Sequence, residues 1–233
     1  ATGAGLALAN IPAAIHAATP PHVVVIGGGF AGATVAKYIR LWSGFTVDVT
    51  LVDPNPNHTS CILSNMVLNN TFAFSELKLP YTHLKSAYGV NVVQDTAKEI
   101  DNAGNRVRLN QGGWVSYDRM VMATGIGFKK PNGLDSNLSP HAWIAGEQTT
   151  LLAEQLAAID MDSTFVMTIP KSPYRCPPGP YERACLVAEM FLRKGITSGD
   201  SPRVVVLDAN SGIQAEKETF SRAFNELYGN VIQ

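Results

Sequence analysis

The sequence predicts an α/β protein built from two Rossmann-like βαβ domains, the first carrying a small antiparallel insertion. Two observations predict this class: continuous apolar runs typical of strands buried in a parallel sheet, and helical patterns that follow these runs after a turn. The chain has 233 residues, 45% of them hydrophobic, which is enough for a buried core.

The first βαβ unit begins with the apolar run HVVVI at residue 22. After a glycine turn, Ala33, Ala36 and Ile39 recur on one side of a predicted helix. The next buried strand, VDVTLVD, ends at Asp53. Residues 90–123 predict short strands separated by the turn signals NAGN and NQGG, so an antiparallel insertion precedes the return to the main sheet.

The second unit follows a helix that begins at Glu147. It comprises the strand TFVMTI, a proline-rich loop, a helix and the strand RVVVLD at 203–208. Pro180 and Glu182 suit the first turn of that helix, and Gly195 suits its end. The predicted apolar face of the helix consists of Ala184, Val187, Ala188, Phe191 and Leu192.

These elements divide the chain into residues 1–20, a first domain at 21–150 and an incomplete second domain at 151–233. The opening ATGAGLALANIPAAIHAATP resembles the later half of an export signal, which would place the protein in the periplasm; the alternative is a flexible terminus. The final residues, LYGNVIQ, stop within a strand-like run. We therefore expect the sequence to be the N-terminal part of a longer chain.

Composition excludes several classes of partner. The net charge is -1 and the chain lacks a basic run, which argues against nucleic acid. It contains no apolar stretch of about 18 residues, the minimum for a transmembrane helix. Its three cysteines show no C-x-x-C spacing, so we expect neither a zinc site nor a self-contained disulfide framework.

A glycine motif between the first strand and helix predicts a dinucleotide site. Gly27 allows a tight turn, Gly29 allows close approach of a pyrophosphate, and Gly32 allows close packing of helix and sheet. The helix N-terminus then faces the phosphates, and Asp53 can accept hydrogen bonds from an adenosine ribose. An acidic residue at the ribose position disfavours the 2′-phosphate of NADP.

A second motif favours FAD over NAD. The segment YDRMVMATG, Tyr117 to Gly125, resembles the Asp-x-x-x-x-Ala-Thr-Gly segment of FAD enzymes built from two dinucleotide-binding domains. In those proteins the strand returns after an antiparallel insertion and turns beside the FAD. Thr124 and Gly125 are therefore candidate FAD-binding residues, although a plain strand-ending turn is an alternative.

The three cysteines differ in their surroundings. Cys176 lies in the sequence CPPGP, where prolines fix the backbone, and it precedes the positive end of a helix. These features indicate thiolate character and a redox or nucleophilic role. Cys61, beside Ile62 and Leu63, is by itself more typical of a small core residue, and Cys185 lies within a helix as a structural residue does.

The loop of the second βαβ unit lacks the glycines of a nucleotide site. Prolines occupy it instead, and their bulk and missing N–H groups make a poor phosphate cradle. We therefore expect the electron donor not to be a nicotinamide nucleotide. The prolines concerned are Pro170, Pro173, Pro177, Pro178 and Pro180.

Taken together, these motifs resemble the flavoprotein (FAD-binding) subunit of flavocytochrome c sulfide dehydrogenase, within the glutathione-reductase-like flavoproteins. The resemblance covers nearly all the chain after residue 21, and its most specific segments are YRCPPGPYERA and PHAWIAGEQTTLL. It implies that Cys61 carries FAD through a thioether to the 8α carbon. It also implies that Cys176 forms a redox-active disulfide with a cysteine later in the chain.

The resemblance implies a sulfide-oxidising reaction. Hydrosulfide would attack the disulfide to form a persulfide, and two electrons would pass through the flavin to c-type haems. Because the chain lacks a C-x-x-C-H motif, the haems would belong to a separate cytochrome subunit. The expected partner of Cys176 and the closing half of the FAD domain are missing from these 233 residues, so we expect this piece alone to be inactive.

Two other functions compete with this interpretation. A sulfide:quinone oxidoreductase has a similar fold and sulfur chemistry but passes its electrons to membrane quinone. A protein of another class, a non-catalytic nucleotide-binding scaffold assembled with a partner, would show no flavin reduction by sulfide.

Overall fold

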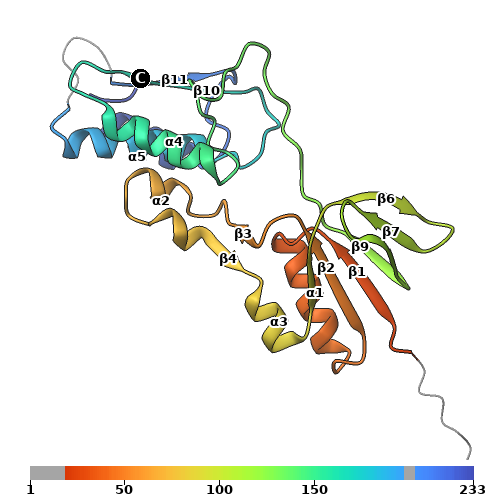
Figure 1. Ribbon diagram of the computed structural model, residues 1–233. Coiled ribbons are helices and arrows are strands. Elements are labelled where there is room, and N and C mark those ends of the chain that lie inside the picture. Colours follow the sequence, from red (N-terminus) through yellow and green to blue (C-terminus); the bar gives the residue numbers. More distant parts are fainter. Residues whose placement is uncertain (1–18, 197–202) are drawn as a thin grey trace, which may run out of the picture. The chain divides into compact units, whose positions relative to one another are not determined.

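The computed structural model describes residues 19–196 and 203–233, which form two compact units (Figure 1). Unit 1 contains the described residues up to Pro56 together with Pro80–Ile126, and unit 2 contains Asn57–Leu79 together with Gly127–Gln233. Parallel strands and intervening helices in both units confirm the α/β prediction. The predicted export signal lies outside the described residues, apart from 19 and 20. The predicted division at residue 150 stays a prediction.

A four-stranded parallel sheet forms the centre of unit 1. It consists of β1 (His22–Ile26), β2 (Asp48–Asp53), β5 (Asn91–Gln94) and β9 (Arg119–Met122), in the order β5-β2-β1-β9. Helix α1 (Phe30–Trp42) lies against this sheet (Figure 1), and its buried Ala36 packs with Val25 and Leu51. Helix α3 (Thr82–Tyr88) precedes β5. The two central strands, β1 and β2, are buried on both faces, which explains their continuous apolar sequences.

The predicted antiparallel insertion is confirmed. Strands β6 (Ala97–Asp101), β7 (Arg106–Leu109) and β8 (Gly113–Ser116) form an antiparallel meander. Alternate residues of β7 are buried, and Val107 packs in one cluster with Val24 and Val52 of the main sheet. The insertion therefore covers part of the sheet before the chain returns to it as β9.

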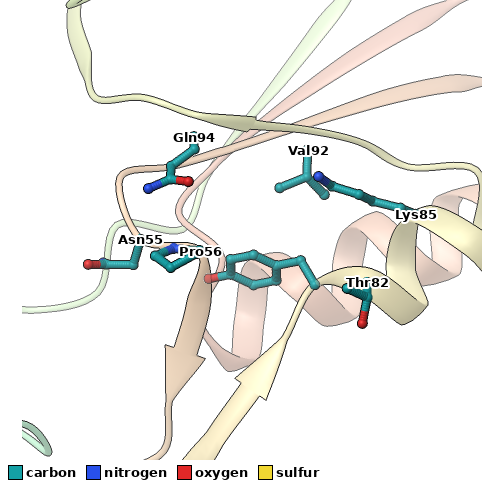
Figure 2. Close-up of a pocket in the computed structure, with 7 residues that line it drawn as sticks. Asn55, Pro56, Thr82, Lys85, Val92 and Gln94 are labelled. Carbon is teal, nitrogen blue, oxygen red and sulfur yellow. The ribbon is translucent and has the colours of Figure 1, made fainter.

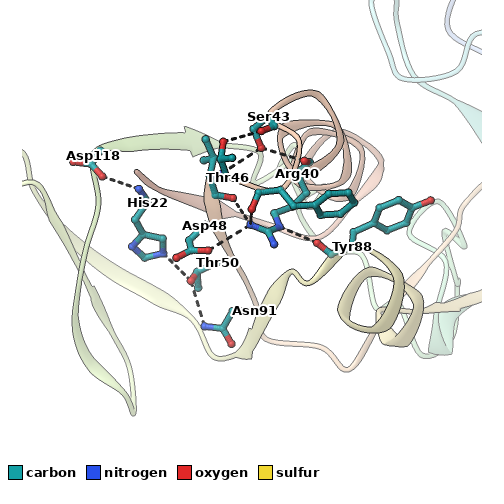
Figure 3. Close-up of polar contacts among 11 residues, drawn as sticks. His22, Arg40, Ser43, Thr46, Asp48, Thr50, Tyr88, Asn91 and Asp118 are labelled. Atoms are coloured by element: carbon teal, nitrogen blue, oxygen red, sulfur yellow. Dashed lines mark hydrogen bonds and ion pairs between the residues drawn. The ribbon is translucent and has the colours of Figure 1, made fainter. Parts of the chain in front are cut away.

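Arg40, in the last turn of α1, ties that helix to its neighbours (Figure 3). Its guanidinium donates hydrogen bonds to the carbonyl oxygens of Val47 and Tyr88, and it forms an ion pair with Asp48 at 3.4 Å. The Arg40 side chain is largely buried, whereas that of Asp48 is exposed. The backbone contacts therefore contribute more to positioning the helix than the ion pair does.

Unit 2 contains the second βαβ arrangement. Strands β10 (Phe165–Ile169) and β11 (Val204–Asp208) are parallel and are connected through helix α5 (Gly179–Arg193). Ile232 forms a parallel bridge with Val204, as the strand-like sequence at the end predicts. The other elements are β3 (Asn57–Thr59), α2 (Asn65–Leu68), η1 (Phe74–Leu77), β4 (Lys78–Pro80), α4 (Glu147–Ala158), α6 (Lys217–Arg222) and the π-helical η2 (Ala223–Leu227).

Helix α5 is the central packing element of unit 2. It begins with Pro180 in its first turn and ends before Gly195, which has a left-handed φ of 74°, as predicted. One predicted core residue is wrong: Leu192 is 37% exposed, whereas Phe191 is fully buried. Each helical residue turns by about 100°, so Leu192 lies near the edge of the apolar face rather than at its centre.

The segment that contains Cys61 packs within unit 2. Leu68 of α2 is buried in the same cluster as Leu152 and Leu156 of α4 and Ala184 of α5. Residues 57–79 therefore leave unit 1 after β2, contribute to the core of unit 2, and return to unit 1 before α3. This packing positions Cys61 relative to α5.

Candidate functional site: a dinucleotide loop and a sulfur centre

The glycine loop and the Ala-Thr-Gly turn meet in unit 1, as the sequence predicts. Gly27 has φ 98° and donates its N–H to Val52 O at 2.8 Å. A Cβ atom added to Gly27 would lie 2.4 Å from Ala123 O and 3.2 Å from Thr124 Cα. A side chain is therefore excluded at Gly27. The adjacent Gly125 has φ 76°, which also favours glycine.

The start of α1 has the features of a phosphate-binding helix terminus. Gly29 is its N-cap and offers no side-chain acceptor to the first turn, FAGA, which contains no acidic residue. A Cβ atom on Gly32 would lie 1.7 Å from Gly27 O, so this glycine is required for the helix to pack on the loop. The N–H groups of an uncapped first turn, together with the helix dipole, favour an anion.

Asp53 braces the glycine loop from the end of β2. Its Oδ2 accepts the N–H of Gly28 at 2.7 Å, and its Oδ1 accepts the N–H of Asn55 at 2.8 Å. The buried Tyr81 donates its hydroxyl to Gly28 O at 3.2 Å. Burial, together with the nearby charge of Asp53, raises the pKa of Tyr81, which keeps this hydroxyl protonated as a donor. A carboxylate has about four acceptor positions, so Asp53 retains capacity for ribose hydroxyls.

A pocket lies beside the end of β2 (Figure 2). Its walls combine the apolar Pro56 and Val92 with polar groups that can hydrogen-bond a ligand. Two of the polar side chains, Asn55 and Gln94, carry amides, and Lys85 carries an ammonium group. The other lining residues are Tyr81 and Thr82. Two of its lining residues, Asn55 and Pro56, follow Asp53 closely in the sequence, so the pocket lies near the end of β2.

In unit 2, Cys176 lies in the proline-rich loop, three residues before the first residue of α5. It is exposed and has φ 56°, a left-handed conformation that is uncommon for a residue with a side chain. The Cys176 carbonyl accepts the N–H of Gly179 at 3.0 Å. A Cβ atom on Gly179 would lie 3.1 Å from Cys176 Sγ and 2.8 Å from the Trp143 ring. Gly179 therefore allows the thiol and Trp143 to approach the helix terminus closely.

A second acidic residue, Asp208, shows how the proline-rich loop is fixed. Asp208 ends β11 as Asp53 ends β2, but its Oδ2 accepts the hydroxyl of the buried Tyr181 at 2.7 Å. Tyr181 also lies 3.5 Å from the hydroxyl of Tyr174 in the loop. Although burial opposes it, hydrogen bonds from Tyr181 and Asn210 hold the pKa of Asp208 below its usual range. Asp208 thus links Tyr181 of α5 to the end of β11.

Cys61 lies in a loop rather than in a hydrophobic core. Its neighbours Ile62 and Leu63 are 59% and 54% exposed, which disagrees with the packing expected of a small core residue. Arg175 donates a hydrogen bond from Nη2 to Cys61 Sγ at 2.7 Å. Because Arg175 is the residue before Cys176, the two sulfur-bearing segments meet at this guanidinium.

Arg183 is a functional candidate that the sequence analysis missed. It is only 5% exposed and donates to Asn65 Oδ1, His141 O and Ala142 O at 2.9–3.1 Å. Its guanidinium also lies over the Trp143 ring, 4.7 Å from the centroid. Burial lowers the pKa of Arg183 to about 10, against the opposing effects of Glu182 and Cys176, so the group remains charged at neutral pH.

The signal for Arg183 was present in the sequence. The segments PHAWIAGEQTTLL and YRCPPGPYERA, which are the most specific to the family, contain Trp143, Arg175 and Arg183. Periodicity could not identify a buried arginine in an otherwise apolar helix face, because its partners come from segments about 40 and 118 residues away.

No metal centre or membrane helix is found in the described part of the chain. Residues 19–196 and 203–233 contain no cluster of three metal-ligating side chains. Within the same residues, every helix is too short or too polar to cross a bilayer. All three cysteines are free thiols in this structure.

Cys185 should react far more slowly than an ordinary thiol. Burial, reinforced by the charge of Glu182, raises the pKa of Cys185 to about 11. Near pH 8 we expect its thiolate fraction, and hence its alkylation rate, to be about 100-fold below that of an unshifted thiol. Iodoacetamide labelling followed by peptide mass mapping measures this rate; labelling of Cys185 as fast as that of an unfolded control would contradict the prediction.

Comparisons with known proteins identify the class. Residues 21–158 match the family model of pyridine nucleotide-disulphide oxidoreductases, and the chain belongs to this family. Residues 149–233 match the model of the central region of the flavoprotein chain of sulfide dehydrogenase (flavocytochrome c). The chain is also 49% identical over 46 residues to that flavoprotein chain from Chlorobaculum thiosulfatiphilum, covering 94% of the relative and 20% of this chain. The predicted membership of the flavocytochrome c sulfide dehydrogenase flavoproteins is thereby confirmed.

Longer matches extend over most of the chain. An NADH dehydrogenase-like protein of Mycobacterium tuberculosis is 29% identical over 211 residues, which is 81% of this chain and 48% of the relative. The chain therefore spans about half the length of this curated relative. The crystal structure of a sulfide:quinone oxidoreductase from Aquifex aeolicus matches 91% of this chain and 50% of its own, with 22% identity and a TM-score of 0.69. This structural likeness confirms the fold.

Proposed function

We propose that the protein containing this chain is a sulfide:cytochrome c oxidoreductase of the flavocytochrome c type, with this chain providing most of its flavin and sulfur chemistry. The observation that carries the proposal is the sulfur centre of unit 2: an exposed Cys176 in left-handed conformation at the start of α5, and Cys61 in contact with the neighbouring Arg175. Strained, exposed residues of this kind are concentrated at functional sites.

FAD fits the residues of unit 1. The uncapped start of α1 beyond Gly27, Gly29 and Gly32 would hold the pyrophosphate, Asp53 would hold the ribose, and Thr124 with Gly125 would approach the cofactor from β9. The pocket lined by Asn55, Lys85 and Gln94 provides polar groups near the adenosine end. Cys61 is the proposed attachment point through a thioether.

In the proposed reaction, Cys176 alternates between a disulfide and a persulfide or thiol. Hydrosulfide attacks the disulfide, so a sulfur–sulfur bond forms to one cysteine while the other leaves as a thiolate. Cys176 precedes the N-terminus of α5, which begins at Gly179. When bound, FAD supplies a two-electron acceptor that passes electrons singly to a c-type cytochrome subunit. The partner cysteine would come from protein sequence beyond these 233 residues.

The proline-rich loop opposes a nicotinamide nucleotide as the donor in unit 2, because it offers few N–H groups to phosphates. Export to the periplasm, where c-type cytochromes and sulfide meet, remains part of the proposal.

Anaerobic reduction tests the proposed activity. Hydrosulfide added to the full-length protein should bleach the flavin absorbance, and a c-type cytochrome added afterwards should become reduced. A short-chain quinone should be a much poorer acceptor. Rapid reduction of quinone without reduction of cytochrome would favour a sulfide:quinone oxidoreductase, and an unbleached flavin would favour the non-catalytic scaffold.

Replacing Cys61 tests the covalent attachment. In Cys61→Ser we expect FAD to remain bound in native protein but to be released completely by acid precipitation, because a serine cannot form the thioether. Flavin fluorescence of the denatured polypeptide measures attachment. The matched control is Cys185→Ser, which removes a thiol from α5. This variant should keep its flavin after denaturation. Flavin retained in denatured Cys61→Ser would contradict attachment at this position.

A further inference from the structure

Arg175 holds the thiol of Cys61 in a defined position. Its Nη2 lies 2.7 Å from Cys61 Sγ, a short distance for a donor to sulfur. The Arg175 carbonyl accepts the indole N–H of Trp143 at 3.1 Å, and its guanidinium lies 5.8 Å from the centroid of the Phe128 ring. Arg175 is exposed, and its contacts with Trp143 and Phe128 restrict how its guanidinium is oriented toward Cys61.

The contact is chemically selective. A guanidinium is permanently charged and can only donate hydrogen bonds, so it stabilises a thiolate more than a thiol. The thiolate is the nucleophilic form of cysteine. The hydrogen-bond acceptor for Arg175 Nη2 is the sulfur atom of Cys61. The geometry therefore places a permanent positive charge beside the sulfur atom of Cys61.

We propose that Arg175 is a positioning residue for covalent attachment of the flavin, activating Cys61 as the nucleophile. This inference rests on the proposed function, which places FAD at Cys61. In the step, the S–H bond of Cys61 and one C–H bond of the 8α methyl group break, and the S–C bond forms. The two electrons and two protons released stay on the ring system, and dioxygen then removes them as hydrogen peroxide.

The proposal also explains why an arginine precedes Cys176. The proline-rich loop carries Cys176, which would react with the substrate. Arg175 of the same loop contacts the sulfur atom of Cys61. A loop fixed by Tyr181 and Asp208 thereby organises both sulfur atoms. Attachment of the cofactor is thus linked to correct folding of the loop that carries the redox cysteine.

The test uses full-length protein produced under riboflavin limitation, purified without flavin and mixed with FAD in air. Attachment is followed as flavin fluorescence of the denatured polypeptide and by mass mapping of the Cys61 peptide. Arg175→Gln should slow attachment by about 10- to 100-fold, as expected for loss of a hydrogen bond to a charged group. Arg175→Lys, which keeps the charge, should recover most of the rate. Arg193→Gln, which removes an exposed arginine of α5, should match the wild type.

A second readout does not require flavin. Alkylation of Cys61 by iodoacetamide in the flavin-free protein should slow by a similar factor in Arg175→Gln and recover in Arg175→Lys. Wild-type rates of both attachment and alkylation in Arg175→Gln would overturn the role of Arg175 while leaving the proposed function intact. An Arg175→Lys variant as slow as Arg175→Gln would overturn the charge-based role. A wild-type protein that never forms a thioether at Cys61 would overturn attachment there, and this inference with it.

Discussion

Replacing Cys176 by alanine in the full-length protein should leave the flavin bound and abolish its reduction by sulfide. The thiol is exposed at the start of α5, so its removal creates no core cavity, and the glycine loop that would bind FAD lies in unit 1. Loss of a covalent nucleophile typically lowers turnover by several powers of ten; we expect roughly 10³-fold or more. Stopped-flow absorbance of the flavin after addition of hydrosulfide measures the effect.

The control for this variant is Cys185→Ala, which removes a thiol from helix α5, the helix that follows Cys176. Burial raises the pKa of Cys185 to about 11, so we assign it no part in catalysis and expect wild-type reduction rates. Dithionite should bleach the flavin in all proteins, which shows that the cofactor remains competent. Wild-type turnover in Cys176→Ala would remove this residue from the mechanism.

Replacing Arg183 by methionine should cause the largest loss of stability. The substitution keeps an unbranched apolar stem but leaves Asn65 Oδ1 and the carbonyls of His141 and Ala142 without their buried donor. Each unsatisfied buried acceptor costs about 1–3 kcal/mol, with some relief from water and rearrangement. We expect the free energy of unfolding to fall by about 3–5 kcal/mol, within the range for breaking a buried charged network. Urea denaturation followed by circular dichroism measures this change.

The matched control for stability is Arg193→Met on the same helix. Its ion pair with Glu189 is exposed, and such pairs contribute at most about 1 kcal/mol. The control should therefore unfold at nearly the same urea concentration as the wild type. If Arg183→Met also left the free energy of unfolding unchanged, the hydrogen bonds of Arg183 to residues 141 and 142 would not stabilise the protein.

Much of the fold follows from sequence pattern. The buried strands, the glycine turn and the antiparallel insertion all depend on interactions between neighbouring residues or on apolar periodicity, both of which can be seen in one sequence. Leu192 shows the limit of this approach. A helical repeat indicates which residues share a face, but the width of the buried stripe depends on what packs against it, so the exposure of Leu192 could not be predicted.

The candidate site was predictable only where its chemistry is local. Gly27, Gly32 and Asp53 obey fixed spacings, and the structure brings the first two into close contact. The contact between Arg175 and Cys61 joins residues 114 positions apart. Neither residue type nor spacing indicates such a pairing, because the contact depends on how the loop before α5 folds next to the Cys61 segment.

The route of the chain through residues 57–79 limits how this protein can be divided. A piece ending near residue 126 would retain the whole sheet of unit 1 but would lack α4 and α5, against which Leu68 is buried. In such a truncated protein the apolar side chains of residues 57–79 would be exposed, which favours aggregation and proteolysis. Cleavage sites, fusion points and expression boundaries chosen from the order of sequence motifs alone would therefore separate Cys61 from the helices that support it.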